Sequence, residues 1–344
     1  MYKSQIDAIN SDLKTTRKAI IAIGCSFVQG QGAINESLFQ EYKWNFQEGR
    51  PLTIDVNNKE RKRLLKHNAN IKLGPGDVLD FSMMEYENAF VNVLCKKYFN
   101  GKYTPINLGI RGCGNRGSIK ELYMYPDINW GIIDEIIVLY VPSGLERFDF
   151  INDEATDHFN WKCMWPHYQN MPDNGRRKLW EGYAKDLHSE KFEVLEQIAH
   201  VQELMTWCKY KNAKLIVTPG FDRRYDRDYF KECLTKAVYR DTRTGEVSSR
   251  ASFFGPNRHD KSQLIDLFPW NNMFRPDGYT TFADLVISKE DKLENKQDYY
   301  GQFLGKGSPD GWITMCAHPS QKGHDLFAHR LYTYIISNFS QQIL

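Results

Sequence analysis

Four short apolar runs alternate with longer amphipathic or polar stretches along the chain. They cover residues 19–23 (AIIAI), 104–108 (TPINL), 136–141 (IIVLYV) and 214–218 (KLIVT). Continuous apolar runs of this length are typical of strands in a parallel sheet that is covered on both faces. We therefore predict four buried parallel strands.

Helical periodicity marks the segments that follow these runs. Apolar residues between 192 and 208 recur at spacings of three and four, at Phe192, Leu195, Ile198, Val201, Leu204, Met205 and Cys208. Near the end of the chain a second apolar stripe follows a helix-start signal at Pro319 and Ser320, and it comprises His324, Ala328, Leu331 and Ile335. The polar first 18 residues predict an amphipathic helix. Strands that alternate with helices predict an α/β fold with three α/β/α layers and a mostly parallel sheet.

Long polar stretches separate the core pieces. Each is too long for a simple loop, so we interpret them as insertions, covering about 33–102, 151–190 and 221–309. The remaining pieces would form the core of one domain spanning 1–344, and they cover about 17–32, 103–150, 191–220 and 310–340. Two aromatic-rich segments, 161–168 and 268–274, would either wall a cleft and stack on sugar rings or pack on the core, and packing is favoured.

The charge is nearly balanced, with 45 basic and 43 acidic residues. This balance predicts no bulk attraction to nucleic acid or to an anionic membrane. No apolar run approaches the roughly 20 residues needed to span a bilayer. The N-terminus lacks the apolar segment of a signal peptide, which predicts a cytoplasmic protein.

Cysteine usage argues against disulfides and zinc. The seven cysteines are odd in number, and none forms a CxxC pair. This pattern is typical of a reducing compartment. The Cys and His residues also lack the spacing of zinc ligands, so we expect no structural zinc site. The reaction inferred below needs neither a metal nor an organic cofactor.

Glycine and small polar residues follow the predicted strands. The segments are GCSFVQGQG (24–32), GIRGCGNRG (109–117), PSGLERF (142–148) and PGFDRR (219–224). A fifth segment, CAHPSQKGH, precedes the last helix. The carboxyl ends of parallel strands meet at one edge of the sheet, where ligands bind. We expect these segments to converge there.

Ser26 is the candidate nucleophile of this edge. A serine at a strand-to-helix turn exposes its Oγ and places backbone N–H groups near the same point. It becomes a nucleophile only when a base takes its proton. The alternative is a serine that merely caps the next helix.

His318 is the candidate base. Pro319 fixes the backbone after it, and Ser320 can cap the final helix. The imidazole would then stand on a rigid junction, as general base catalysis requires. We expect the second histidine, His324, to pack or hydrogen-bond inside the helix. The alternative for His318 is an ordinary loop histidine.

The loop at 109–117 allows two interpretations. Gly112, Gly114 and Gly117 match G-x-G-x-x-G, and Asp134 follows about twenty residues later, as in dinucleotide-binding sites. However, Asp134 precedes the next strand, whereas the ribose-binding acid should end it. We favour an anion cradle, in which the Gly112 N–H and the Asn115 side-chain amide face a developing oxyanion.

Together these segments resemble the SGNH, or GDSL, hydrolase superfamily. The first block reads Gly-Cys-Ser-Phe-Val-Gln-Gly at 24–30, with cysteine in place of the family's aspartate. The second, Asn-x-Gly-x-x-Gly, spans 107–112, and His-Pro-x-x-x-Gly-His spans 318–324. The resemblance covers about half the chain. It implies a serine esterase with Ser26 and His318 as catalytic residues, and with the N–H groups of Ser26 and Gly112 as oxyanion donors.

The chain departs from the family in two places. The third strand ends in Val-Pro-Ser-Gly-Leu-Glu-Arg at 141–147 and lacks the oxyanion asparagine. Either Asn115 or Ser143 substitutes for it, or the oxyanion hole has one donor fewer. We assign Ser143 and Arg147 to substrate binding, although a salt bridge to a nearby acid is the favoured alternative for Arg147. The family's aspartate three residues before the histidine is replaced by methionine. Asp310 is the nearest upstream acid, and without it the site would be a Ser–His dyad.

The predicted function is hydrolysis of small acyl esters, such as acetyl esters, including those on a glycan. The partners would be an acyl-ester or an acetylated glycan, and the oligomeric state is not predicted. Cys25 is a further candidate nucleophile, but its side chain should point into the core. A weaker resemblance to SGNH-like proteins of large tailed phages implies a phage or virion setting. The competing hypothesis is a weak or inactive module that binds a glycan or has a structural role in a virion.

Overall fold

The structure is a computed structural model. It describes residues 3–33, 53–55, 78–110, 112–152, 160–164, 175–182, 189–235, 239–240, 247–248, 260–291, 303, 307–314 and 317–339. Much of the three predicted insertions lies outside these ranges, as do Met315 and Cys316 just before His318. The second half of the aromatic-rich segment 161–168 is likewise outside them.

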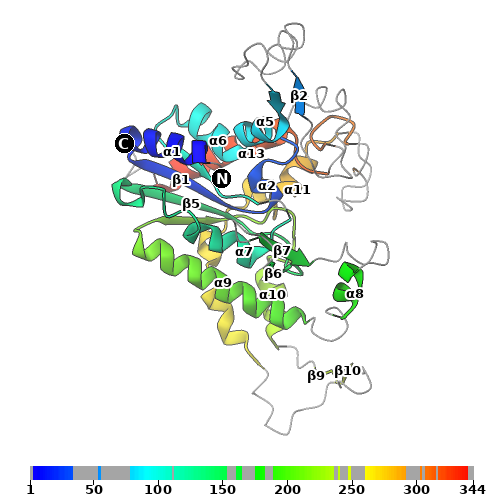
Figure 1. Ribbon diagram of the computed structural model, residues 1–344. Coiled ribbons are helices and arrows are strands. Elements are labelled where there is room, and N and C mark those ends of the chain that lie inside the picture. The colour runs from blue at the N-terminus through cyan, green and yellow to red at the C-terminus, as the bar shows by residue number, and fades with distance from the viewer. Residues whose placement is uncertain are drawn as a thin grey trace.

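Four parallel strands form the central sheet, in the order β4-β1-β5-β8 (Figure 1). Their bounds are Lys18–Gly24 for β1, Thr104–Asn107 for β4, Glu135–Val141 for β5 and Lys214–Val217 for β8. Each predicted strand is confirmed to within one residue at either end. The α/β fold is confirmed as well.

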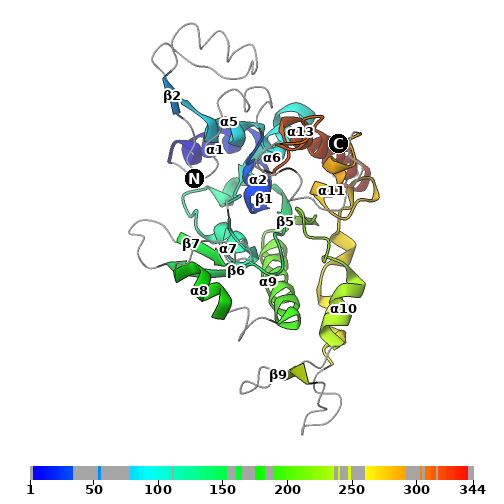
Figure 2. The same cartoon turned by 90° about the vertical axis from the view of Figure 1, so that its right-hand side faces the viewer.

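Helices cover both faces of this sheet. Alternate residues of β1 point to opposite faces, with Ile21 and Ile23 in one buried cluster and Ile20 and Ala22 in the other. Helices α7 and α9 pack on the first face, and α6 and α13 on the second (Figures 1 and 2). The strands read as continuous apolar runs because both of their faces are buried.

The predicted helices are present. They are α1 (Lys3–Thr16), α9 (Glu190–Tyr210) and α13 (Gln321–Phe339). The other α-helices among the described residues are α2 (Ser26–Gln29), α5 (Phe81–Asn88), α6 (Phe90–Val93), α7 (Asn115–Lys120), α8 (Gly175–Gly182), α10 (Arg227–Thr235) and α11 (Phe282–Ile287). A π-helix, η1 (Leu94–Tyr98), continues α6. Short 3-10 helices are η2 (Glu121–Tyr123), η3 (Trp130–Ile132), η6 (Ser262–Leu267), η7 (Trp270–Asn272) and η8 (Pro276–Gly278).

Parts of the stretches predicted as insertions belong to the core. Phe90 and Leu94, from α6 and η1, are fully buried beside the sheet. In the segment 268–274, Phe268 packs against Phe230 at 5.2 Å between ring centroids. That aromatic segment therefore packs on the core, as favoured from the sequence. Outside the central sheet, short strands pair in twos: β2 (Thr53–Asp55) with β3 (Val78–Asp80), β6 (Phe148–Asn152) with β7 (Asn160–Met164), and β9 (Tyr239–Arg240) with β10 (Val247–Ser248).

Within the described part of the chain, none of the helices has the length and apolar character required to cross a bilayer. Five of the seven cysteines are free and buried, namely Cys25, Cys95, Cys113, Cys208 and Cys233. They behave as small core side chains.

Candidate active site

The turn after β1 presents Ser26 as the first residue of α2. Cys25 occupies the cap position, and its side chain makes no capping hydrogen bond because it lies in the apolar core. Ser26 is therefore not the cap of this helix. Gly24 permits the tight packing here, since a Cβ on it would lie 2.4 Å from the carbonyl oxygen of Val141. Ser26 itself is only 5% exposed.

The loop after β4 is fixed beside this turn. Asn107 donates from Nδ2 to the carbonyl oxygen of Val28 at 2.8 Å, and its Oδ1 accepts from the N–H of Gly109 at 3.0 Å. The Ile110 N–H donates to the carbonyl oxygen of Gly24 at 3.0 Å. The Asn-x-Gly-x-x-Gly segment is thus hydrogen-bonded to the turn and the helix that carry Ser26. That role explains why an asparagine stands at 107.

A narrow hairpin holds His318. The N–H of Ser320 donates to the carbonyl oxygen of Trp312, and both the N–H and the Oγ1 of Thr314 donate to the carbonyl oxygen of His318, at 2.9 and 3.1 Å. Ala317, just before the histidine, has a φ of 58°, a left-handed conformation that costs a non-glycine residue of order 1 kcal/mol or more. The hairpin therefore fixes the backbone of His318 firmly.

Ser26 and His318 meet although 292 positions separate them in the chain. Oγ of Ser26 lies 2.7 Å from Nε2 of His318, and both residues are buried. For Nε2 to accept the serine proton, the neutral imidazole must carry its own proton on Nδ1. The ring of Phe27 lies against the imidazole, with 5.1 Å between centroids. The pair is thus a hydroxyl and a potential base in hydrogen-bond contact within a buried site.

Asp310 is placed differently from the position that a catalytic acid would take. Its carboxylate accepts the N–H of Asp291 at 3.1 Å, and its own N–H donates to Glu290. The expectation of Asp310 as the orienting acid has no support in this geometry, because the turn at 307–311 directs its carboxylate toward the end of α11.

The glycine-rich loop does form an anion cradle, but a carboxylate of the chain itself occupies it. Asp149 accepts the N–H of Gly114 at 2.7 Å and that of Gly117 at 2.8 Å. It is only 3% exposed. The carboxylate thereby caps the first turn of α7. Gly112 precedes this cradle with a φ of 68° and remains partly exposed. Its predicted role as an oxyanion donor is compatible with that position and stays a prediction.

Both polar groups of the Asn115 side chain form structural hydrogen bonds. Its Oδ1 accepts the N–H of Ser143 at 2.8 Å, and its Nδ2 donates to the Tyr225 hydroxyl at 2.8 Å. Tyr225 in turn donates to the carbonyl oxygen of Ser143 at 3.0 Å. This closed, buried network joins the ends of β5 and β8. Because the amide is used there, the geometry argues against Asn115 as an oxyanion donor, and Ser143 is buried in the same network.

Arg147 lies between the glycine loop and the end of β8. Its Nη1 donates to the carbonyl oxygen of Cys113 at 3.2 Å, and its guanidinium lies 5.2 Å from the centre of the Phe221 ring. It is 8% exposed. Arg147 therefore stabilises the position of Cys113, the residue next to Gly112. Its predicted role in substrate binding stays a prediction.

Asp134 lies at the opposite edge of the sheet. Its carboxylate forms a bidentate ion pair with Arg17, at 2.7 and 2.9 Å, just before β1 and β5 begin. It cannot serve a nucleotide bound at the carboxyl ends of the strands. With Asp149 filling the glycine cradle, the dinucleotide interpretation is wrong. No cluster of three or more potential ligand side chains suited to a metal ion occurs within the described ranges.

His324 has a structural position, as expected. It is fully buried, and its Nδ1 accepts the N–H of Phe90 at 3.2 Å. The two rings lie nearly parallel. Burial, with a smaller contribution from the nearby His318, lowers the pKa of His324 to about 3. The imidazole is therefore neutral in the folded protein at physiological pH.

Two acidic residues near the site were not anticipated from the sequence. One is Asp149, which lies in the strand β6. The other is Glu85, 1% exposed on α5, which accepts the N–H of Gly32 at 2.8 Å. Neither stands in a recognisable motif. The sequence carried one signal for Asp149. The glycine-rich loop turns several backbone N–H groups toward one point, and such groups favour a nearby anion.

The comparisons with known proteins show distant structural similarity and no sequence match. No family model and no curated protein sequence matches it. One similar solved structure is a carbohydrate esterase whose active site is described as having divergent catalytic and non-catalytic binding functions. The TM-score is 0.40 at 12% identity, over 94% of this chain and 70% of that one. Another is an acetyl xylan esterase from the rumen bacterium Butyrivibrio proteoclasticus, with a TM-score of 0.38 at 11% identity, over 94% of this chain and 64% of that one.

Proposed function

We propose that this protein is a serine hydrolase of SGNH type that cleaves small acyl esters, such as acetyl esters. The observation that supports the proposal most is the 2.7 Å contact between Oγ of Ser26 and Nε2 of His318. A hydroxyl becomes nucleophilic when a base in hydrogen-bond reach can take its proton. Three sequence blocks, far apart in the chain, meet around this contact.

The reaction would follow the usual two steps of acyl transfer. Oγ of Ser26 attacks the carbonyl carbon of the ester while Nε2 of His318 takes its proton. The tetrahedral intermediate then expels the alkoxide, which receives that proton and leaves as the alcohol. Water attacks the acyl-serine with His318 again as base, which releases the carboxylic acid and restores the serine. The N–H groups of Ser26 and Gly112 are proposed to hold the oxyanion.

Two of the predicted supporting residues, Asp310 and Asn115, form other hydrogen bonds. Asp310 makes its hydrogen bonds elsewhere, and Asn115 is engaged by Ser143 and Tyr225. In a related triad, loss of correct orientation by the acid costs up to about 10⁴ in kcat, and loss of one oxyanion donor costs about 10²–10³. We therefore expect a slow esterase. The hairpin that holds His318 would contribute to the orientation of the imidazole.

Hydrolysis of p-nitrophenyl acetate and of an acetylated sugar tests the proposal. The wild type should hydrolyse at least one of them, and Ser26→Ala should lower kcat on the order of 10³-fold or more. Cys25→Ala is the matched control, because the neighbouring thiol is fully buried in the core and should be dispensable for the chemistry. Equal rates for wild type and Ser26→Ala on both esters would favour the non-catalytic module. The cytoplasmic or virion setting and the single-domain organisation stay predictions.

A further inference from the structure

The turn at 30–32, which follows α2, contacts both members of the Ser26–His318 pair. The N–H of Gly30 donates to the carbonyl oxygen of Ser26 at 3.1 Å. At the other end of the turn, a Cβ on Gly32 would lie 3.1 Å from the Cβ of His318. The turn therefore links the backbone of the candidate nucleophile to the side chain of the candidate base.

Gly32 packs tightly against the hairpin that holds His318. Its φ of 83° lies in the left-handed region, which favours glycine. A Cβ there would also lie 2.7 Å from Oγ1 of Thr314 and 3.2 Å from the carbonyl oxygen of Pro319. Oγ1 of Thr314 already donates to the carbonyl oxygen of His318, so it can move aside only by losing that bond. A displacement of the turn is therefore transmitted to the hairpin.

A buried carboxylate fixes the turn from the side of α5. Glu85 accepts the N–H of Gly32 at 2.8 Å and is almost fully buried. The backbone of α5 is equally close, since a Cβ on Gly30 would lie 2.4 Å from the carbonyl oxygen of Glu85. Hydrogen bonds to an ionised acceptor are shorter and stronger than those between neutral groups. The turn is thus held between α5 and the hairpin.

The junction of α5 and α6 also holds the segment that follows His318. Nδ1 of His324 accepts the N–H of Phe90 at 3.2 Å, and Nε2 of Gln321 donates to Oδ1 of Asn88 at 3.3 Å. Gln321 and His324 lie in the first turn of α13. Helices α5, α6 and α13 lie side by side in both views (Figures 1 and 2). The same two short helices therefore support the turn and the base.

We propose that Glu85 is a positioning residue of the hydrolase, which acts through Gly32 to set the distance between Oγ of Ser26 and Nε2 of His318. A nucleophile and its base cooperate only within hydrogen-bond reach, and the 2.7 Å contact meets that condition. The catalytic consequence rests on the proposed function. The geometric consequence does not, because the hydrogen bond can be measured without a substrate.

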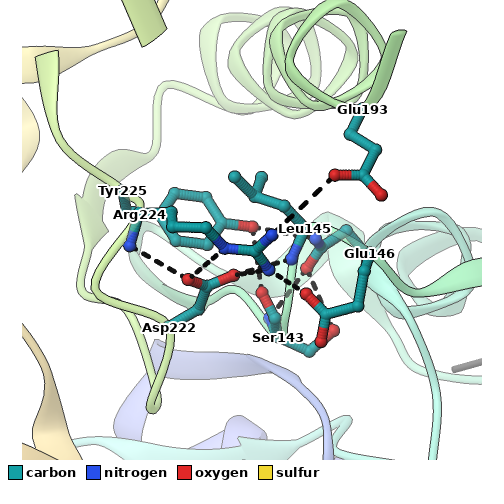
Figure 3. A network of polar contacts seen from close by, with 8 residues as sticks. Ser143, Leu145, Glu146, Glu193, Asp222, Arg224 and Tyr225 are labelled. Carbon is teal, nitrogen blue, oxygen red and sulfur yellow. Dashed lines mark hydrogen bonds and ion pairs between the residues drawn. The ribbon is translucent and has the colours of Figure 1, made fainter. Parts of the chain in front are cut away.

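Another buried carboxylate at the same sheet edge offers a control. Figure 3 shows the Arg224 guanidinium beside the carboxylates of Asp222 and Glu146. Asp222 accepts the N–H of Leu145 at 2.8 Å, which ties the loop after β5 to the loop after β8. Like Glu85, it is a buried acceptor for a loop N–H. Its partners, however, lie outside the turn and the hairpin.

The test is ¹⁵N NMR of the full chain labelled at its histidines. The signal lost in His318→Gln identifies His318, and Ser26→Ala gives the Nε2 position without the serine hydrogen bond. Glu85→Ala should move the signal at least about half of the way to that position, because hydrogen bonds weaken steeply as their geometry worsens. Glu85→Gln, which keeps an acceptor oxygen for Gly32, should stay near the wild-type position. Asp222→Ala should lower the free energy of unfolding but leave the signal unchanged.

Gly32→Ala tests the same turn without changing Glu85, and it decides the question if Glu85→Ala does not fold. The added Cβ meets the hairpin, so the His318 signal should move in the same direction. Gly101→Ala is the matched control. Gly101 also has a left-handed φ, of 73°, but a Cβ on it would meet open space. The signal should therefore stay in place in Gly101→Ala.

Three comparisons of the His318 signal can overturn the proposal. It fails if Glu85→Ala leaves the signal at the wild-type position, if Asp222→Ala moves it as far, or if Gly32→Ala moves it no further than Gly101→Ala. It also fails if the wild-type signal already lies at the position found without the serine hydroxyl, because no hydrogen bond would then exist to be positioned.

Hydrolysis of p-nitrophenyl acetate measures the catalytic consequence. Glu85→Ala should lower kcat at least about tenfold with little change in KM, since a small displacement of a nucleophile from its base slows the chemical step. Glu85→Gln should retain most of the activity. A wild type that hydrolyses no ester would count against the proposed function alone, and the NMR comparison would still decide the role of Glu85.

Discussion

Gly109 lies so close to the helix of the candidate nucleophile that a Cβ on it would be 2.2 Å from the backbone nitrogen of Gln29. The contact is backbone against backbone, with no flexible side chain that could move aside. The loop after β4 and the helix α2 therefore fix each other. The position of Ser26, three residues before Gln29, depends on this contact.

Gly109→Ala should consequently displace α2. Forcing a methyl group into a packed contact costs about 1–3 kcal/mol, and here the backbone must also move. We expect a lower free energy of unfolding in urea and a loss of esterase activity of at least about tenfold, since small shifts in a nucleophile lower kcat strongly.

Gly131→Ala provides the comparison for this substitution. The nearest atom to a Cβ at Gly131 is 3.8 Å away, and its φ lies outside the left-handed region. The free energy of unfolding and the esterase activity should both stay close to the wild-type values. A Gly109→Ala protein as active as Gly131→Ala would show that the contact does not position Ser26.

Asp149→Ala should destabilise the glycine loop. The change leaves the N–H groups of Gly114 and Gly117 without their carboxylate, and hydrogen bonds to a charged group are worth about 1.5–3 kcal/mol each. We expect a loss of about 2–4 kcal/mol in the free energy of unfolding, measured in urea. Asp266→Ala, at an exposed ion pair, should cost less than about 1 kcal/mol. Similar losses for the two variants would contradict the role given to Asp149.

His324 should make stability depend on pH. Burial lowers its pKa to about 3 in the folded chain, whereas an unfolded histidine titrates near 6.5. Between these values the unfolded chain binds more protons, so the free energy of unfolding falls as the pH falls from about 6.5. This group alone should remove about 3 kcal/mol by pH 4.

Urea unfolding of wild type and His324→Phe over pH 4–8 measures that contribution. Phenylalanine can replace the ring that stacks on Phe90 but cannot titrate. The variant should therefore show a flatter decline below pH 6.5. An equally steep decline in both proteins would mean that His324 is not the responsible group.

The sheet and the long helices were predictable because their signals are local. Each of the four strands is an unbroken apolar run, and α9 and α13 have clear helical spacing. The meeting of Ser26 with His318 was predictable too, since both follow or flank elements whose ends converge at one sheet edge. Short sequence motifs sufficed for these features.

The surroundings of the pair were not predictable, because they depend on long-range polar contacts. A carboxylate at 149 fills a cradle that looked suited to a bound oxyanion, and Tyr225 takes the amide of Asn115. Neither partner is near its target in the sequence. Helix α6 was read as part of an insertion because its single turn is too short to show a period.

The reaction of Ser26 with a fluorophosphonate tests the central claim most directly. Such reagents phosphonylate a serine whose proton is taken by a neighbouring base, and mass spectrometry of peptides locates the adduct. We predict one adduct per chain, on Ser26, and at least a hundredfold slower labelling in His318→Gln, which removes the base. Labelling at another residue, or an unchanged rate in His318→Gln, would contradict the account.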